Sequence, residues 1–294
     1  MSAEDPLRTP VPRQDVDRLL SAARAGEPGA SSLEGLAATA HLSRFHLSRL
    51  LKEHLGFPLR QFLAAARVDR GIEVLLDGHD VTRSQVESGH ESASSYTHAF
   101  ARHTGMAPSR YRQQMRALAS HLVRHMNDVT PLVALNRDYG ADEHRQSHGL
   151  TIRVTGAQQG SALFVALNPT PIIVGRPTIG IALLGGVEEY EVTSIPDGTY
   201  YAMVVELPRG QGLRGFFQMD ANRRQLARTP ITFPLAAPQS LVLELRDLLP
   251  TDPPITPNIP KLFLDGVRGR GGAQVSNPGQ GDSNSGQSNT GEPG

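Results

Sequence analysis

Two stretches of the sequence carry side chains suited to contact with nucleic acid. In the first, Phe45, Ser48, Arg49 and Lys52 recur at intervals of three and four residues, which places them on one face of a helix. A guanidinium can bond to two acceptors of a guanine, a phenyl ring can contact a thymine methyl, and an ammonium group can neutralise a phosphate. Solvated helix faces seldom combine these groups. The alternative interpretation is an exposed face with one partly buried Phe45.

A second stretch, residues 93–104, is predicted to form another helix with a polar outward face. Its outward side chains are Ser94, His98 and Arg102. The aromatic residues Tyr96 and Phe100, four positions apart, point inward. Gly89 marks a tight turn before the helix, and Gly105 ends it. Each stretch therefore reads as the second helix of a helix-turn-helix, the element that is free to enter a DNA groove.

Caps and helix breakers delimit the first of these two units. Ser31 or Ser32 caps a short helix, Ser43 caps the helix of residues 44–55, and Gly56-Phe57-Pro58 ends it. The core side of the two helices consists of Leu33, Leu36, Ala37, Ala40, Leu47, Leu50, Leu51 and Leu55. This periodic apolar pattern predicts two short helices packed against each other.

A long helix over residues 59–76 is predicted between the two units. Its 18 residues, at about 1.5 Å each, span about 27 Å. That length approaches the ~34 Å between successive major-groove faces of a duplex. A stiff spacer of this kind holds two recognition helices on one side of the DNA, one helical turn apart.

The double arrangement also follows a known family pattern residue by residue. The first unit matches at Ser32, Leu33, Glu34, Leu36, Ala37, Leu42, Ser43, His46, Leu47, Arg49, Leu50, Lys52 and Gly56. The second unit ends on Gly105-Met106-Ala107-Pro108-Ser109-Arg110-Tyr111-Arg112. Over about 80 residues the chain resembles the DNA-binding module of the AraC/XylS family of bacterial transcriptional regulators. The resemblance implies sequence-specific binding to double-stranded DNA.

The resemblance also implies which side chains contact the DNA. By position, the base-edge readers are Phe45, Ser48 and Arg49 in the first helix, and Ala93, Ser94, Ser95 and His98 in the second. Candidates for the phosphate contacts that set the register are Arg44, Lys52, Arg102, Arg110 and Arg112. Because Arg49 can discriminate guanine by about 1–3 kcal/mol, we expect the first helix to dominate specificity and the second to add affinity.

The second unit departs from the family pattern at two places. Ser84-Gln85 stands where the family has an apolar residue followed by Ala, and His90 stands where it has an aromatic residue. We therefore expect the first helix of the second unit to bury less apolar area than its counterpart.

The rest of the chain changes character after the helical part. Residues with alternating polarity around Ile152, Tyr190 and Leu243, together with the apolar run 161–167, predict six or more short strands. The segment Ile195-Pro196-Asp197-Gly198-Thr199-Tyr200-Tyr201 weakly resembles a hairpin of transthyretin-like and carboxypeptidase-regulatory-like sandwiches. The predicted fold class is an all-α double helix-turn-helix domain followed by an all-β sandwich-like domain and a disordered tail.

Composition sets the predicted boundaries. They are a flexible N-terminus at 1–13, the DNA-binding domain at 14–127, a linker at 128–148, the β-sandwich at 149–265 and a disordered tail at 266–294. A helix over 113–126 has an apolar seam that either packs back on the module or pairs with a second copy. After Val275 no aliphatic or aromatic side chain occurs, so the tail cannot form a core.

Charge and cysteine content restrict the classes of function. Residues 1–127 carry 16 Lys and Arg against 13 Asp and Glu, a net +3 that the remainder balances at −3. This modest basic bias fits a few placed phosphate contacts. The chain has no cysteine, which excludes disulfides, thiolate metal sites and cysteine nucleophiles. No apolar run is long enough to cross a membrane, so we expect a cytoplasmic protein of bacterial origin that binds no membrane.

No catalytic constellation stands out, so we expect no enzyme, no cofactor and no metal. His121 and His125 have a spacing that can ligate zinc, but no third ligand lies near them, and solvated histidines are the favoured interpretation. The main hypothesis is a transcriptional regulator whose β-domain senses a small-molecule effector or mediates assembly, for instance as a homodimer. The alternatives are a β-domain that binds a protein partner and, less favoured, a DNA-modifying enzyme.

Overall fold

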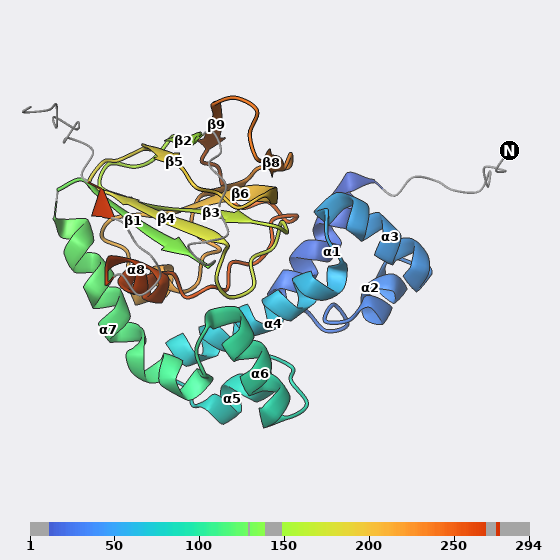
Figure 1. The fold of residues 1–294 in the computed structure, drawn as a ribbon. Helices are drawn as coiled ribbons and strands as arrows, with labels where there is room; N and C mark the ends of the chain where they lie inside the picture. The colour runs from blue at the N-terminus through green and yellow to red at the C-terminus, as the bar shows by residue number, and fades with distance from the viewer. Residues whose placement is uncertain (1–11, 129, 139–148, 269–274, 277–294) are drawn as a thin grey trace, which may run out of the picture.

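The computed structural model describes residues 12–128, 130–138, 149–268 and 275–276 (Figure 1). A helical region is followed by a strand-rich domain that contains two sheets, here called the β-domain. This confirms the expected order of a helical region followed by a strand-rich domain. The expected flexible N-terminus and disordered tail fall almost entirely outside the described residues.

Seven helices form the helical region in the described part of the chain. They are α1 (Arg13–Ala25), α2 (Leu33–Thr39), α3 (Arg44–Leu55), α4 (Leu59–Leu76), α5 (Val81–Glu87), α6 (Ala93–Thr104) and α7 (Pro108–Asn127). Serine side chains cap α2, α3 and α6 by accepting hydrogen bonds from backbone N–H groups of the first turn. Gly56 and Gly105 end α3 and α6 in the left-handed conformation that glycine adopts without strain.

Each helix-turn-helix unit is built on its own hydrophobic cluster. In the first unit, α1, α2, α3 and the start of α4 bury a set that includes Leu20, Leu36, Leu47 and Phe62. In the second unit, the end of α4 packs with α6 and α7. The spacer α4 therefore belongs to both cores. Its 18 residues match the predicted bounds, and at about 1.5 Å per residue it spans about 27 Å.

The β-domain has one large and one small sheet. Its strands are β1 (Leu132–Arg137), β2 (Leu150–Thr155), β3 (Ala162–Asn168), β4 (Ile179–Leu184), β5 (Glu189–Val192), β6 (Gly198–Leu207), β7 (Arg224–Leu226), β8 (Ile231–Phe233), β9 (Gln239–Glu244) and β10 (Val275–Ser276). The large sheet has the order β10-β1-β4-β3-β6-β7, with β8 also paired to β6, and the small sheet has the order β5-β2-β9. All pairings are antiparallel except β2 with β9.

The two faces of the large sheet differ in what covers them. One face packs against the small sheet across a cluster that includes Leu135, Ile152, Val165 and Leu243. The other face packs against α7 and α8 (Ile259–Val267), as Figure 1 shows. This second cluster continues without a break into the second helix-turn-helix unit. The helical region and the β-domain thus share one core.

The structure corrects two predicted boundaries and one predicted hairpin. Residues 132–137, expected within a linker, form β1, a strand of the large sheet paired with β4 and β10. The turn at 196–198 joins β5 in the small sheet to β6 in the large sheet, so these strands do not form a hairpin. Residues 266 and 267, expected in the tail, belong to α8, and the β-domain is therefore not all-β. The three differences have one physical reason: contacts with residues distant in sequence decide the structure of segments whose local composition is typical of loops.

The apolar seam of α7 is occupied within the chain. Met115, Leu118, Leu122 and Met126 are all buried in the cluster that α7 shares with the β-domain. The seam was predicted to pack on the module or to pair with a second copy; the structure shows it packed against the module and the β-domain together. Among the described residues, no helix combines the length and apolar character needed to cross a bilayer.

Candidate nucleic-acid interface

Helix α3 presents the first predicted reading face to solvent. Leu47, Leu51 and Leu55 are buried against the first unit. On the opposite side, Arg44, Phe45, Arg49 and Lys52 are exposed and Ser48 is half-buried. Phe45 has 75% of its surface exposed, and the Arg44 guanidinium carbon lies 4.9 Å from the centre of its ring. A phenyl ring held in water in this way costs free energy, so the geometry does not support the partly buried Phe that was the alternative.

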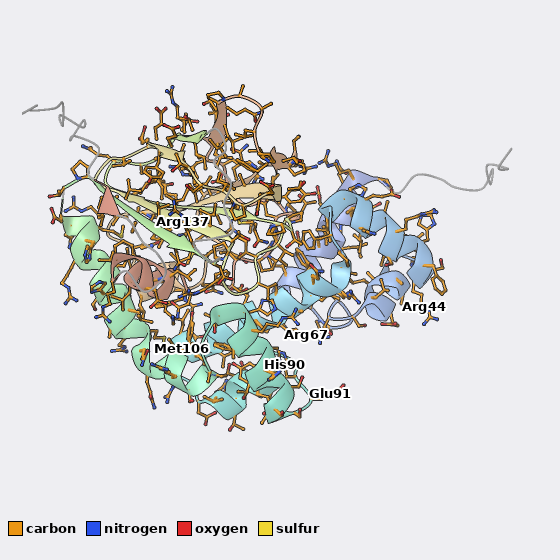
Figure 2. All side chains as sticks on the ribbon, in the orientation of Figure 1. Arg44, Arg67, His90, Glu91, Met106 and Arg137 are labelled. Carbon is orange, nitrogen blue, oxygen red and sulfur yellow. The ribbon has the colours of Figure 1, made fainter. Side chains whose placement is uncertain are left out.

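Helix α6 presents the second predicted reading face. Tyr96 and Phe100 are fully buried, as their spacing predicts. The predicted readers on the other side, Ala93, Ser94, Ser95 and His98, are exposed, and so is Arg102. Figure 2 shows Arg44 at the start of α3 and Glu91 just before α6, both on the side of the helical region away from the strands. The β-domain therefore does not cover these two helix starts.

The predicted phosphate-binding cations on α3, α6 and α7 lack acidic partners among the described residues. Arg44, Lys52, Arg102 and Arg110 are exposed and form no ion pair with any described carboxylate, and Arg112 donates a hydrogen bond to the Gly78 carbonyl oxygen at 3.1 Å. Among the described arginines of the β-domain, Arg153, Arg176, Arg214, Arg223, Arg224 and Arg246 form ion pairs, whereas the exposed Arg209 and Arg228 form none with a described carboxylate. The first turns of α3 and α6 also carry no acidic residue. The positive ends of both helix dipoles are thus left open to an anion.

The two departures in the second unit are resolved by polar contacts. Ser84, which stands at an expected apolar position, is fully buried. Its hydroxyl donates to the Gly71 carbonyl oxygen at 2.7 Å and lies 2.5 Å from the Tyr96 hydroxyl oxygen. The ring of His90 lies 5.2 Å from that of Tyr96, and its Nδ1 is 3.0 Å from Ser88 Oγ. Helix α5 buries little apolar area, as expected, but it is anchored through α4 and α6.

The β-domain contacts the first unit through a loop and an ion pair. In the loop between β3 and β4, Ile172 is 1% exposed and packs into the core of the first unit. From α1, Arg24 reaches Asp220 of the β-domain at 2.9 Å and also donates to the Asp252 carbonyl oxygen. These contacts fix the first unit against the strands.

The β-domain also contacts the spacer and the second unit. Arg214 forms ion pairs with Glu73 on α4, at 3.3 Å, and with Asp77, which caps the end of α4. At the end of α6, His103 Nδ1 lies 2.9 Å from Thr256 Oγ1, and both side chains are buried. Edge-to-face ring contacts run from Tyr96 through Phe100 and Tyr111 to Phe217 of the β-domain. Both reading helices are therefore positioned by one common support.

Two buried titratable groups lie in this junction. Burial, and secondarily Asp220, raises the pKa of Asp69 on α4 to about 7. Burial, and secondarily Arg102, lowers the pKa of His103 to about 4, so its contact with Thr256 is made by a neutral imidazole. The sequence contained no local signal for either role. Asp69 lies in an amphipathic helix like any surface carboxylate, and Thr256 is 153 residues from His103.

Comparison with known proteins agrees with this geometry. Residues 36–114 match a family model described as a helix-turn-helix domain. No curated protein matches the chain. Three solved structures are similar to part of it. They are the C-terminal domain of AraT, a response regulator from Geobacillus stearothermophilus (24% identity, 34% of this chain and 84% of that chain covered, TM-score 0.32), a protein of unknown function from Listeria innocua (27%, 36% and 97%, TM-score 0.30), and a DNA-binding transcriptional dual regulator from Escherichia coli K-12 (24%, 36% and 99%, TM-score 0.29).

The matched residues form a helix-turn-helix domain, which supports DNA binding by this part of the chain. The domain is of the AraC type, as the sequence pattern predicts, and such a domain indicates a DNA-binding transcriptional regulator. The β-domain lies outside the matched residues.

Proposed function

We propose that this protein is a transcriptional regulator that reads DNA with α3 and α6 in successive major grooves. The observation that carries the proposal is the exposed polar side of α3 and α6. Its cations Arg44, Lys52 and Arg102 form no ion pair with any described carboxylate, and the first turn of neither helix carries an acidic residue. Exposed cations and open helix N-termini are both groups that bind phosphates.

Within this proposal each predicted side chain has a role. Phe45, Ser48 and Arg49 read base edges from α3, and Ala93, Ser94, Ser95 and His98 read them from α6. The exposed Arg49 is the group that discriminates guanine, and the exposed Phe45 ring meets a thymine methyl. Phosphates are held by Arg44, Lys52, Arg102, Arg110 and Arg112. We place the regulator with its DNA in the cytoplasm of a bacterium.

Paired substitutions on one helix test this assignment. Full-length protein is used to select sequences from random duplexes and to titrate the selected site at several salt concentrations. We expect Arg49→Ala to relax the preference at one base pair, with a loss of about 1–3 kcal/mol of discrimination there. Lys52→Ala should weaken all sequences alike and lower the salt slope by about 1.

Arg153→Ala is the matched control, because Arg153 is an exposed arginine of the small sheet paired with Glu189. It should change neither preference nor salt slope. An unchanged base preference in Arg49→Ala would show that α3 does not read sequence in this way. Loss of preference in the control would point to a different DNA-binding surface.

For the β-domain we propose effector sensing, with no enzymatic activity. Support comes from the scarcity of exposed apolar surface, since the exposed large hydrophobic residues of its described part are only Val242 and Leu249. A protein-binding surface would present a contiguous apolar patch. An apolar pocket also lies between α8 and the large sheet. No group of three metal-ligating side chains occurs among the described residues. Comparing selected sequences and affinities with and without small-molecule extracts tests this part.

A further inference from the structure

A cleft of about 380 Å³ lies where α1 and α4 meet the β-domain (Figure 1). Three parts of the chain form its walls, namely the end of α1, the spacer α4 and two loops of the β-domain, which flank β7 and follow β9. A cleft between separate parts of a fold, with a volume of at least about 300 Å³, is a common setting for a small-molecule site.

An unpaired carboxyl group lies at the bottom of this cleft. Asp69 on α4 is 8% exposed, whereas every other lining residue is half-buried or exposed. Its carboxyl group accepts no hydrogen bond and forms no ion pair within the described part of the chain. Neither oxygen is among the fully enclosed side-chain oxygens that lack a partner, so both reach solvent through the cleft. A buried ionisable group that opens only toward a cleft marks a binding site.

The other two carboxylates of the cleft have arginine partners. Asp220 of the β-domain forms an ion pair with Arg24 of α1 at 2.9 Å. Glu73 of α4 forms one with Arg214 at 3.3 Å. Both carboxylates nevertheless act on Asp69 and disfavour its ionised form. Asp69 therefore lies among charges of both signs, and it alone of the three has no cation within ion-pair distance among the described residues.

Two further guanidinium groups lie near the cleft and are engaged elsewhere. Arg224, which is 2% exposed, lies 4.0 Å from Asp220. The Arg70 guanidinium packs against Gly26, so closely that no side chain fits at that position. Gly26 caps the C-terminus of α1, where the partial negative charge of the helix dipole favours a cation. No arginine in the described part of the cleft is thus free to approach Asp69.

The charges that line the cleft set the charge of a ligand. The carboxylates are Asp69, Glu73 and Asp220, and the guanidinium groups are Arg24 and Arg70. With Asp69 ionised, three negative charges stand against two positive ones. One positive charge on a ligand balances this set, whereas a second one would enter a partly buried site without a partner.

We infer that this cleft binds a small aliphatic ligand with one ammonium group, which donates hydrogen bonds to the Asp69 carboxylate. The ammonium group is compact and has three donors, so it can reach a carboxylate at the bottom of a cleft. Ala25, Leu248 and Pro250 supply apolar wall for the aliphatic part. The inference rests on the proposed function where it makes this ligand the effector of DNA binding.

A ligand in this cleft contacts the helical region and the β-domain at once. On the helical side it meets α1 of the first helix-turn-helix unit and the spacer α4, which belongs to the cores of both units. On the other side it meets the loop that carries Asp220. Binding therefore stabilises the arrangement in which the β-domain supports both reading helices. We expect occupancy to strengthen DNA binding.

Release of a proton is expected to accompany binding. Burial, and secondarily Asp220, raises the pKa of Asp69 to about 7 against the opposing effect of Arg24 and Arg224. An ammonium group favours the ionised carboxylate, so the ligand displaces the proton. The expected release is about 0.9 proton per ligand at pH 6 and about 0.1 at pH 8, and affinity rises with pH until about pH 7. Calorimetry in buffers of different ionisation enthalpy measures this number.

Three compounds with the same four-carbon chain test the ligand class on the full-length protein at pH 8. Butylammonium is a cation with N–H donors, butyltrimethylammonium is a cation without them, and 1-butanol is neutral with one O–H donor. Binding is followed by calorimetry and by the methyl resonances of Ala25 and Leu248. We expect saturable binding of butylammonium and at least about 10-fold weaker binding of the other two, because only butylammonium forms a charge-assisted hydrogen bond.

Two variants separate the site from general attraction to an acidic surface. Asp69→Asn keeps the volume of the side chain and removes its charge, so the variant should fold. It should bind butylammonium at least about 10-fold more weakly and release no proton on binding. Asp247→Asn is the matched control, because Asp247 is an exposed carboxylate next to Leu248 that does not line the cleft. It should bind butylammonium, and release the proton, as the unmodified chain does.

DNA affinity is measured on the same samples with and without saturating butylammonium, at equal ionic strength. We expect a rise of at least about 5-fold in the natural chain, the lower end of common coupling effects, and none in Asp69→Asn. The inference is overturned if butylammonium does not bind saturably, if Asp69→Asn binds it equally well, or if bound butylammonium leaves DNA affinity unchanged. DNA binding without butylammonium tests the proposed function separately, because it does not depend on the cleft being filled.

Discussion

The substitution Asp69→Asn should make the protein more stable at neutral and alkaline pH. Asp69 lies on the spacer helix, 8% exposed, where burial and then Asp220 raise its pKa from 3.8 to about 7 against the opposing effect of Arg24 and Arg224. At about 1.4 kcal/mol per pH unit, this difference corresponds to about 4 kcal/mol. Replacing the carboxyl with an amide removes the cost of ionising a buried group.

The sign follows from proton binding in the two states. Between about pH 4 and 7 the folded chain keeps the Asp69 proton that the unfolded chain has lost, so stability falls with rising pH by about 4 kcal/mol. His103 acts in the opposite direction, because its pKa is lowered from 6.5 to about 4. Between those values the unfolded chain holds the extra proton, and stability rises with pH by about 3 kcal/mol. In the natural sequence the two effects nearly cancel.

Urea denaturation from about pH 4 to about pH 8 measures the effect. The signals are far-ultraviolet circular dichroism and tyrosine fluorescence, since the chain has no tryptophan. Asp69→Asn should match the natural chain near pH 4, gain about 3 kcal/mol by pH 6.5 and stay above it to pH 8. The exposed Asp247 supplies the control variant Asp247→Asn, which should leave the profile unchanged. A profile for Asp69→Asn parallel to that of the natural chain would refute the reasoning.

Three further substitutions probe the core of the second helix-turn-helix unit, the contact between the first unit and the β-domain, and the ion pairs of α8. Ser84→Ala removes a buried hydroxyl bonded to Tyr96 and should lower stability by about 1–3 kcal/mol; a loss below about 0.5 kcal/mol would mean that the contact is not stabilising. Ile172→Ala should cost about 2–5 kcal/mol, against about 0.5 or less for the exposed Val242→Ala, and hydrogen exchange should rise in α1–α3 first. Asp265→Asn removes the ion pairs of Asp265 with Arg176, in the loop between β3 and β4, and with Lys261 on α8 itself. The backbone amides of α8 should then exchange hydrogen about 3- to 10-fold faster. Equal exchange in variant and natural chain would contradict that role for the pairs.

The helices were predictable from the sequence because their signals are local. Caps at Ser43 and Ser92, and glycines at the ends of α3 and α6, lie within a few residues of the structure they define. The apolar periodicity of residues 59–76 predicted α4 with its observed bounds. The base-reading and phosphate-binding roles of single residues stay predictions.

The β-domain was predictable only in part, because its determinants are distant in sequence. Strand β1 ends on Asn136-Arg137 and follows a proline, a pattern typical of a linker, and it is a strand because it pairs with β4 and β10. The parallel pairing of β2 with β9 joins segments about 90 residues apart, which no local pattern encodes. Ile172 looks like part of a turn rich in proline and threonine, yet its burial depends on the first helix-turn-helix unit.

The shared core between the helices and the strands constrains the length of the DNA site. Because Ile172 and Thr256 tie the two reading helices to one body, their separation and relative rotation are preset. Inserting one base pair between the half-sites rotates them by about 34–36° about the duplex axis. Two helix-turn-helix units joined flexibly could rotate to follow the half-sites. Two units held in one rigid body can follow only if the protein or the duplex is distorted. In the proposed complex, tolerance of the half-site spacing is thus a property of the β-domain as much as of the two helices proposed to read bases.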